Sequence, residues 1–150
     1  MTKVPVPVSM AVLYQQQSFL MQLRDDKDNI LYPGKWGLFG GHLEPEELPQ
    51  AGLIREVKEE INYSLKEPIL FRCYCDSRVS RYIYFASLEV SLADLELNEG
   101  QDFALVPLSN VRLGYYYSNK LAKNRYLGDI HRQILLDFAN YAQAHLVDFK

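Results

Sequence analysis

The sequence contains no apolar run that approaches the ~20 residues a helix needs to cross a bilayer. Its first ten residues, MTKVPVPVSM, lack the apolar core of a signal peptide. Repeats, low-complexity tracts and linkers rich in proline or glycine are also absent, and no basic stripe favours binding to a nucleic acid polymer. With 150 residues and 48% hydrophobic content, the chain is expected to form a single domain, residues 1–150, in the cytoplasm and free of membranes.

Cysteine is scarce, with only Cys73 and Cys75 in the chain. One residue separates them in a segment expected to be a strand, so their Cα atoms should lie ~7 Å apart, at or beyond the limit for a disulfide. Two cysteines without suitably spaced histidines also make a poor zinc site. We therefore expect two packed, unbonded thiols.

Short segments rich in β-branched and aromatic residues predict a sheet. The first two strands should be joined by a polar turn at Gln15–Gln17. A Pro-Gly turn then leads into a short aromatic strand that ends in two glycines, and a hairpin follows further along the chain. The predicted strands lie within residues 8–26 (two strands), 29–41, 69–77, 80–90 and 103–108.

Two segments predict helices, at about Pro49–Ile61 and within residues 127–145. Asp129 is the expected N-cap of the second helix. One side of that helix is apolar, so it should cover a face of the sheet. The predicted fold class is therefore α/β, a mixed sheet with two principal helices. The apolar positions of the second helix are Ile130, Ile134, Leu135, Phe138 and Tyr141.

Glutamate is concentrated in one segment. Residues 41–63 contain six glutamates against Arg55 and Lys58, a net charge of −4, whereas the whole chain carries −3. The acidity is therefore local, which favours a cation site over a general gain in solubility.

Three of these carboxylates share one side of the first helix. At ~100° per residue, Glu56, Glu59 and Glu60 fall within an arc of about 100°, away from the apolar side. Glu59 and Glu60 should therefore not be needed for packing. Gly52 lies in the same arc, so its missing side chain should leave room above the carboxylates. Clustered carboxylates suit Mg²⁺ or Mn²⁺, while a solvated acidic face is the alternative that the residues leave open.

The acidic segment also resembles the Nudix box of the Nudix hydrolases, G-x5-E-x7-R-E-U-x-E-E-x-G-U, where U is aliphatic. The preceding WGLFGG is similar to the strand that leads into the box. The resemblance implies a Nudix-type α/β/α sandwich, with the box helix and the C-terminal helix flanking the mixed sheet. The matching residues are Gly41, Glu47, Arg55, Glu56, Val57, Glu59 and Glu60.

The resemblance implies a role for each of these residues. Metal ligands would be Glu56, Glu59 and Glu60 together with a backbone carbonyl of Gly40 or Gly41. Arg55 would hold the acidic side chains in place, Glu47 among them. Glu99 would be a further ligand or general base, its alternative being an ordinary loop carboxylate. The implied catalytic set is Arg55, Glu59, Glu60 and Glu99.

Four positions depart from the family's pattern. Asn62 replaces the usual glycine, and asparagine is the next best residue for a left-handed helix end. Glu46 occupies a turn position where the family often has glycine, so strain is expected there. Leu48 cannot cap the helix through its side chain, although Pro49 at the first helical position partly compensates. Tyr63 replaces an aliphatic residue.

By resemblance, the protein would hydrolyse the diphosphate linkage of a nucleoside diphosphate joined to a group X, with Mg²⁺ or Mn²⁺ as cofactor. Such a cation neutralises the diphosphate and activates water, and a nearby carboxylate can take the proton. The sequence does not identify the group X. Sugar nucleotides, dinucleoside polyphosphates and nucleoside triphosphates are all compatible with the resemblance. The alternatives are a non-catalytic nucleotide-sensing module on the same fold and an acidic structural helix that binds a partner. The expected partner is a small nucleotide, and a homodimer is compatible with the sequence.

Several basic and aromatic residues are candidates for substrate contact, each with a surface charge or a core aromatic as its alternative. In the Tyr115–Tyr117 run, one ring is expected to be buried and the others to lie near the rim of the cleft. Candidates for phosphate contact are Arg24, Lys35, Arg72 and Arg81, and candidates for base stacking are Tyr32, Trp36 and Tyr82.

Overall fold

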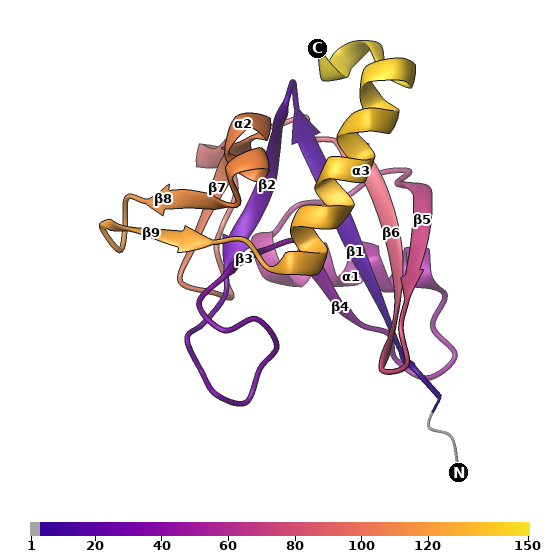
Figure 1. Cartoon of the computed structure of the whole chain (residues 1–150). Coiled ribbons are helices and arrows are strands. Elements are labelled where there is room, and N and C mark those ends of the chain that lie inside the picture. Colours follow the sequence, from indigo (N-terminus) through magenta and orange to yellow (C-terminus); the bar gives the residue numbers. More distant parts are fainter. Residues whose placement is uncertain (1–3) are drawn as a thin grey trace.

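A seven-stranded mixed sheet forms the centre of the computed structural model, which describes residues 4–150 (Figure 1). The strand order is β3-β2-β1-β6-β5, with β4 also pairing with β1 and β7 with β2. The only parallel pair in the described sheet is β1 with β6. The strands are β1 (Val6–Gln15), β2 (Ser18–Leu23), β3 (Trp36–Gly37), β4 (Phe39–His42), β5 (Ile69–Cys75), β6 (Val79–Ser87) and β7 (Asp102–Pro107).

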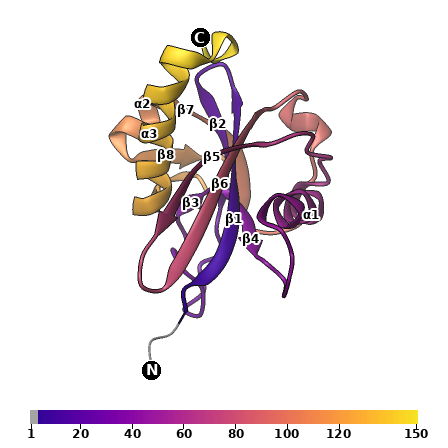
Figure 2. The same cartoon turned by 90° about the vertical axis from the view of Figure 1, so that its right-hand side faces the viewer.

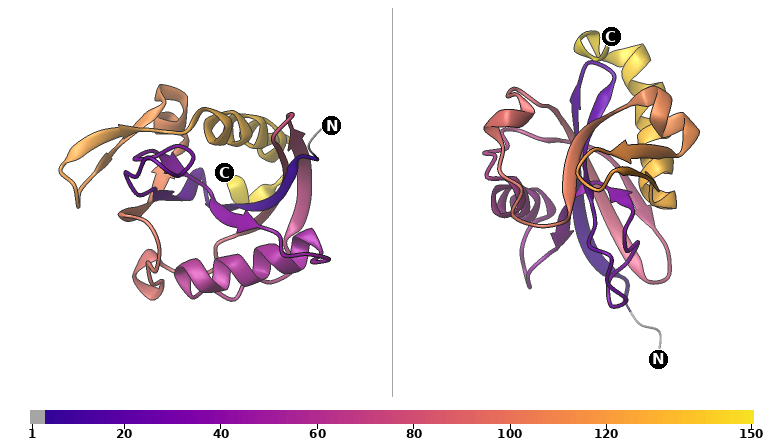
Figure 3. Two further views of the ribbon diagram at one scale, coloured as in Figure 1. Left: turned by 90° about the horizontal axis from the view of Figure 1, so that it is seen from below. Right: turned by 90° about the vertical axis from the view of Figure 1, so that its left-hand side faces the viewer.

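Helices cover both faces of this sheet, as Figures 2 and 3 show. The alternation of side chains along β1 explains the two layers: Ala11 and Leu13 pack on the side of α1 (Pro49–Ile61), whereas Val12 and Tyr14 pack on the side of α3 (Asp129–His145). The predicted α/β sandwich is confirmed. Among residues 4–150, no helix is both long and apolar enough to cross a membrane.

The ends of α1 follow the sequence closely. Leu48 is the N-cap without a side-chain hydrogen bond, and Pro49 occupies the first turn. Asn62 ends the helix in the left-handed conformation, with φ at 54°, and its backbone N–H donates to the carbonyl of Lys58. Glu46 also has a positive φ, 65°, so the expected strain at this turn is present.

On α3, the predicted N-cap is wrong. Gly128 holds the cap position, while Asp129 lies in the first turn, where its charge still suits the helix dipole. Ile134, Leu135 and Phe138 are buried as expected. The remaining predicted positions, Ile130 and Tyr141, are only partly buried against the same core.

The segment after β7 contains elements that the sequence did not predict. These are α2 (Leu108–Leu113), β8 (Tyr115–Ser118), β9 (Lys123–Tyr126) and the short 3-10 turn Val147–Phe149. A further 3-10 turn that the sequence did not predict, Leu92–Asp94, precedes β7. The β8–β9 hairpin extends away from the main sheet (Figure 1). Tyr115 and Tyr117 are exposed and Tyr116 is half-buried against Trp36, so the prediction of one buried ring and two at the cleft is wrong.

The two cysteines are exposed and unbonded, so the expected packing of their thiols is wrong. Their strand, β5, is the last in the strand order and therefore lies at the edge of the sheet. Neighbouring apolar residues of the strand, Ile69 and Leu70, are exposed as well. The residue types predicted a strand correctly but not its place in the sheet.

Replacing Glu46 by glycine should raise the free energy of unfolding by up to ~1 kcal/mol, because glycine adopts a positive φ without a Cβ clash. Gln50→Gly, in the helical first turn of α1 and equally exposed, should lower it by ~1 kcal/mol. Urea denaturation of both variants measures the two changes. Equal destabilisation by both substitutions would contradict a strained turn at Glu46.

Candidate active site

A cavity of about 450 Å³ opens between α1, the end of β4, the 24–35 loop and the start of α3. Carboxylates of α1 line one end of it, and arginine, aromatic and apolar side chains line the other. The predicted site residues that reach the cavity are Arg24, Tyr32, Gly40, Gly41, Glu56, Glu60, Arg81 and Glu99.

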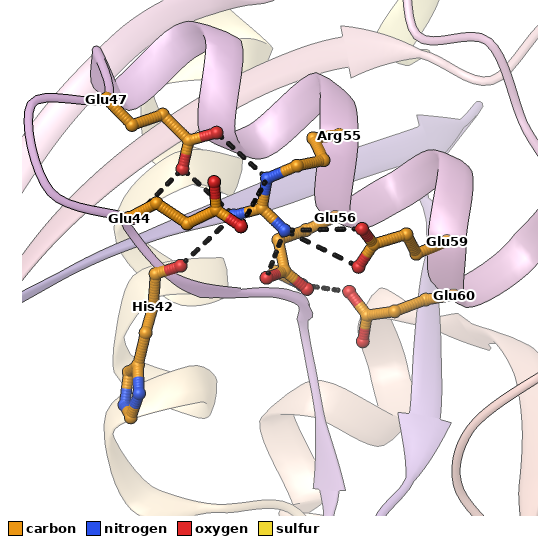
Figure 4. Close-up of polar contacts among 8 residues, drawn as sticks. His42, Glu44, Glu47, Arg55, Glu56, Glu59 and Glu60 are labelled. Carbon is orange, nitrogen blue, oxygen red and sulfur yellow. Dashed lines mark hydrogen bonds and ion pairs between the residues drawn. The ribbon is translucent and has the colours of Figure 1, made fainter.

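Arg55 connects the loop before α1 to the helix itself (Figure 4). Its Nε and one terminal nitrogen donate to the two oxygens of Glu47, at 2.8 and 2.9 Å. Its other terminal nitrogen donates to Glu56 at 3.0 Å and, at 3.4 Å, to Glu59. The hydrogen bonds from Arg55, and next the one from the Glu44 backbone N–H, lower the pKa of Glu47 to about 2. Arg55 therefore contacts acidic side chains and, through the carbonyl of His42, the end of β4.

Glu56 lies between Arg55 and the glycines of β4. A Cβ placed on Gly41 would come within 2.7 Å of the Glu56 carboxylate oxygens, so the glycine allows this close approach and a larger residue would push the carboxylate aside. Burial raises the pKa of Glu56, and the charges of Glu59 and Glu99 raise it further against the opposing effect of Arg55. The Glu56 carboxylate is thus held at the cavity wall by a cation on one side only.

Glu60 is buried, with 3% of its surface exposed, so the expectation that it has no part in packing is wrong. Its carboxylate accepts hydrogen bonds from the Gly40 backbone N–H at 2.9 Å and from the Gln22 side chain at 3.2 Å. Burial, and then the charge of Glu99, raises the pKa of Glu60 to about 8. A carboxyl group with this pKa is half protonated in mildly alkaline solution unless positive charge is added.

Glu59 and Glu99 lie farther from the centre of the site. The Glu59 side chain is 60% exposed and turns toward Arg55. Glu99 lines the cavity and raises the pKa of both Glu56 and Glu60, which places its carboxylate near theirs. Within residues 4–150, no three acidic, histidine or cysteine side chains are gathered closely enough to form a ready metal cage.

Gly52 does not open the site as expected. A Cβ at this position would lie 2.8 Å from Glu47 Oε1 and closer still to the Leu43 side chain. The missing side chain therefore makes room for the loop that carries Glu47. The glycine positions a residue that Arg55 binds and leaves no space for a ligand.

The far end of the cavity contains residues that the sequence did not single out. His131, on the first turn of α3, is 3% exposed and lines the cavity. Its Nδ1 accepts the backbone N–H of Leu38 at 3.0 Å, and burial lowers its pKa to about 3. Gln22 was also missed. In the sequence, a buried histidine or glutamine cannot be told from an ordinary core residue. The one signal that could have identified these two is that each is a polar residue within an otherwise apolar face of its helix or strand.

Some of the residues proposed to contact the substrate line the cavity, and the others do not. Arg24, Arg81 and Tyr32 line the cavity. Trp36 is fully buried and donates to the Tyr116 carbonyl, so it offers no free ring face to a base. The remaining candidates, Lys35, Arg72 and Tyr82, lie outside the cavity; Tyr82 packs in the core beneath α1, and Arg72 is exposed near Asp137.

A model of the NUDIX domain family matches residues 4–125 of the sequence. This chain belongs to the Nudix family. The predicted family is therefore confirmed, and so is the predicted enzyme class, a Nudix hydrolase acting on phosphoanhydride bonds. Four of the five charged box residues, Glu47, Arg55, Glu56 and Glu59, are joined by the Arg55 contacts, and the fifth, Glu60, is bound by β4.

A similar protein agrees with this assignment, and solved structures share the fold. The nucleoside triphosphatase NudI of Escherichia coli is 29% identical over 102 residues, which cover 58% of this chain and 70% of NudI. The MutT protein of Methanosarcina mazei superimposes with a TM-score of 0.70 at 20% identity, over 95% of this chain and 99% of that one. The NUDIX domain of Shewanella oneidensis NrtR, complexed with ADP ribose, gives 0.69 at 19% identity over 93% and 89%.

The raised pKa of Glu60 predicts that the metal-free protein loses stability as pH rises. The folded state keeps the Glu60 proton up to pH about 8, whereas the unfolded state releases it near 4.5, so unfolding releases a proton between these values. The free energy of unfolding should fall by up to ~1.4 kcal/mol per pH unit in that window. His131 has the opposite effect on the free energy of unfolding below pH 6.5. Its folded-state pKa of about 3 lies below the ordinary 6.5, so stability rises with pH between these two values.

Chemical denaturation in EDTA between pH 7 and 8 therefore isolates the contribution of Glu60. Glu60→Gln should remove the fall in stability over this range and be more stable than the parent at pH 8. A parent and a variant with parallel pH profiles would show that Glu60 is ionised in the folded protein at neutral pH.

Proposed function

We propose that this protein is a Mg²⁺- or Mn²⁺-dependent pyrophosphohydrolase that cleaves the diphosphate linkage of a nucleoside diphosphate joined to a group X. The observation that carries the proposal is the set of three carboxylates lining the cavity, the buried Glu60, the partly buried Glu56 and the exposed Glu99. Burial and the neighbouring negative charges raise the pKa of Glu56 and of Glu60, so their ionised forms are disfavoured alone and would be favoured by a divalent cation that neutralises them.

The donor set fits a hard cation. Glu56, Glu59 and Glu60 would supply carboxylate oxygens, with a backbone carbonyl of Gly40 or Gly41, and oxygen ligands are those that Mg²⁺ and Mn²⁺ prefer. Glu59 is exposed and its side chain is held by two 3.4 Å contacts to Arg55, so it would join the set through a change of rotamer. When bound, the cation would neutralise the diphosphate and lower the pKa of an attacking water.

The protein's own groups would do the remaining work. Glu99, exposed at the cavity edge, is the proposed acceptor of the proton from water, with Glu59 as the alternative. Arg55 orients Glu47, Glu56 and Glu59 without reaching the substrate, because its donors are directed to these carboxylates and to the His42 carbonyl. Arg24 and Arg81 are the proposed substrate contacts.

Nucleoside triphosphates are the substrates to test first, because the similar E. coli NudI is named a nucleoside triphosphatase. A nucleotide-sensing module that binds without turnover is the alternative, and the NUDIX domain crystallised with ADP ribose shares the fold. The presence of every charged residue of the box supports the enzyme. A location in the cytoplasm, where such nucleotides occur, and a homodimer belong to the same proposal.

Removing the cation or one of its ligands should abolish turnover. We expect hydrolysis of nucleoside triphosphates with Mg²⁺, none in EDTA, and a kcat lowered ~10²–10⁴-fold by Glu60→Gln. Glu67→Gln, an exposed glutamate outside the cavity, is the matched control and should retain full activity. Release of phosphate or pyrophosphate and the melting temperature, measured on the same samples, test the proposal. Undiminished turnover in chelator, or in Glu60→Gln, would refute it.

Arg55→Ala should weaken the apparent affinity for Mn²⁺ by ~10–100-fold, because the carboxylates lose the group that orients them. Arg55→Lys should recover little of this affinity, since an ammonium cannot bind both oxygens of Glu47 in the same way. Mn²⁺ titrations of activity and of metal binding by electron paramagnetic resonance make the measurement. A raised KM with an unchanged Mn²⁺ titration would instead place Arg55 on the substrate.

A further inference from the structure

The far end of the cavity presents a neutral hydrogen-bond donor that the proposed chemistry does not use. The Leu38 backbone N–H donates to Nδ1 of His131, so the proton of the neutral ring is on Nε2. Nε2 has no hydrogen-bond partner among residues 4–150. In that same range, Ser9 Oγ is the only side-chain polar atom that is both closed off from solvent and without a partner. Since Nε2 of His131 has no partner, it must be open to solvent, and the cavity is the space that this residue lines.

Two guanidinium groups share this end of the cavity with His131. Arg81 is 7% exposed and donates one hydrogen bond to Asp76 at 3.0 Å. Arg24 donates through Nε to the Leu31 carbonyl at 2.7 Å. Guanidinium groups only donate, and the part of the chain that the structure describes leaves further N–H groups of each without a partner. Of the acidic residues lining the cavity, the glutamates lie at the other end and Asp25 is a partly exposed neighbour of Lys27. Ligand atoms at the His131 end therefore need to be acceptors.

The walls at this end suit a flat ring. Leu38, whose backbone N–H binds His131, lines the cavity, and the ring of Tyr32 meets the His131 ring edge to face at 5.3 Å. Met10 and Val79 add further apolar lining to the cavity. A phosphate group would lose its hydration against these apolar side chains. His131 stays neutral, because burial lowers its pKa to about 3, so it offers a donor without adding to the charge of the two guanidinium groups. A heterocycle with ring carbonyls meets both requirements.

We propose that His131, with Arg24 and Arg81, forms the base-binding end of the cavity and selects nucleobases that present a carbonyl oxygen over those that present an amino group there. This inference rests on the proposed nucleotide hydrolysis and names the class of base. Uracil and cytosine test it directly, because they share one ring and differ in whether position 4 accepts or donates. When a buried N–H donor faces an amino group, neither group has a hydrogen-bond acceptor, and this loss lowers the affinity for the amino-bearing base.

The test compares kcat/KM for UTP and CTP with Mg²⁺. We expect the parent to prefer UTP by ~10-fold or more, the discrimination of one good base contact. In His131→Asn the side-chain oxygen can still accept the Leu38 N–H, but the Nε2 donor is lost. The preference should fall toward one, mainly through a higher KM for UTP. His145→Asn, at the exposed end of the same helix and outside the cavity, is the matched control and should keep the preference.

Binding of UMP and CMP, measured by calorimetry, separates this inference from the proposed function, because neither nucleotide has a diphosphate to cleave. Tighter binding of UMP that is lost in His131→Asn supports the base site even where no triphosphate is hydrolysed. Hydrolysis of UTP and CTP at equal rates overturns the inference and leaves the proposed function standing. An equal loss on both nucleotides in His131→Asn also overturns it, and assigns the histidine to holding Leu38.

Discussion

The contacts of Arg55 hold the acidic end of the cavity together. One guanidinium group binds both oxygens of Glu47, the nearest oxygen of Glu56 and the carbonyl of His42. These partners come from the loop, the helix and the end of β4, so a single residue fixes three segments relative to each other. The rigid planar fork of arginine allows this, because its donors point in fixed directions.

This arrangement also explains two glycines of the acidic segment. Gly41 lets the Glu56 carboxylate approach β4, and Gly52 leaves space for Glu47 and Leu43 beside the helix. Both glycines therefore allow carboxylates to lie against backbone, where hydration is reduced. The consequence is electrostatic: reduced hydration raises the pKa of Glu56 and Glu60, while the fully paired Glu47 has a pKa of about 2. The same segment thus contains one carboxylate whose charge Arg55 balances and two whose ionised forms burial disfavours.

The sequence predicted the box helix to the residue because local signals decide its ends. Pro49 fits only the first turn, and Asn62 tolerates the left-handed conformation that stops the helix. Trp36 and the cysteines were misplaced because their exposure depends on which strands are neighbours, and sequence periodicity does not encode strand order. Glu60 lies at the edge of the predicted acidic arc, and only the approach of β4 and β2 buries it. His131 was missed because one buried histidine on an amphipathic helix looks the same whether its second nitrogen faces a core or a cavity.

Glu60 lies where the central sheet divides. β1 and β2 pair only near their hairpin, at Tyr14 and Gln15 of β1. Beyond this point β4 pairs with the freed edge of β1 and β3 with that of β2, while β7 pairs with the other edge of β2 along its whole length. The Glu60 carboxylate crosses this gap, accepting one hydrogen bond from Gly40 on β4 and one from Gln22 on β2. A charge-assisted hydrogen bond is about twice as strong as a neutral one, so ionised Glu60 binds both halves of the sheet more firmly than its protonated form. A cation that favours the ionised form would therefore also tighten the division from which the cavity opens.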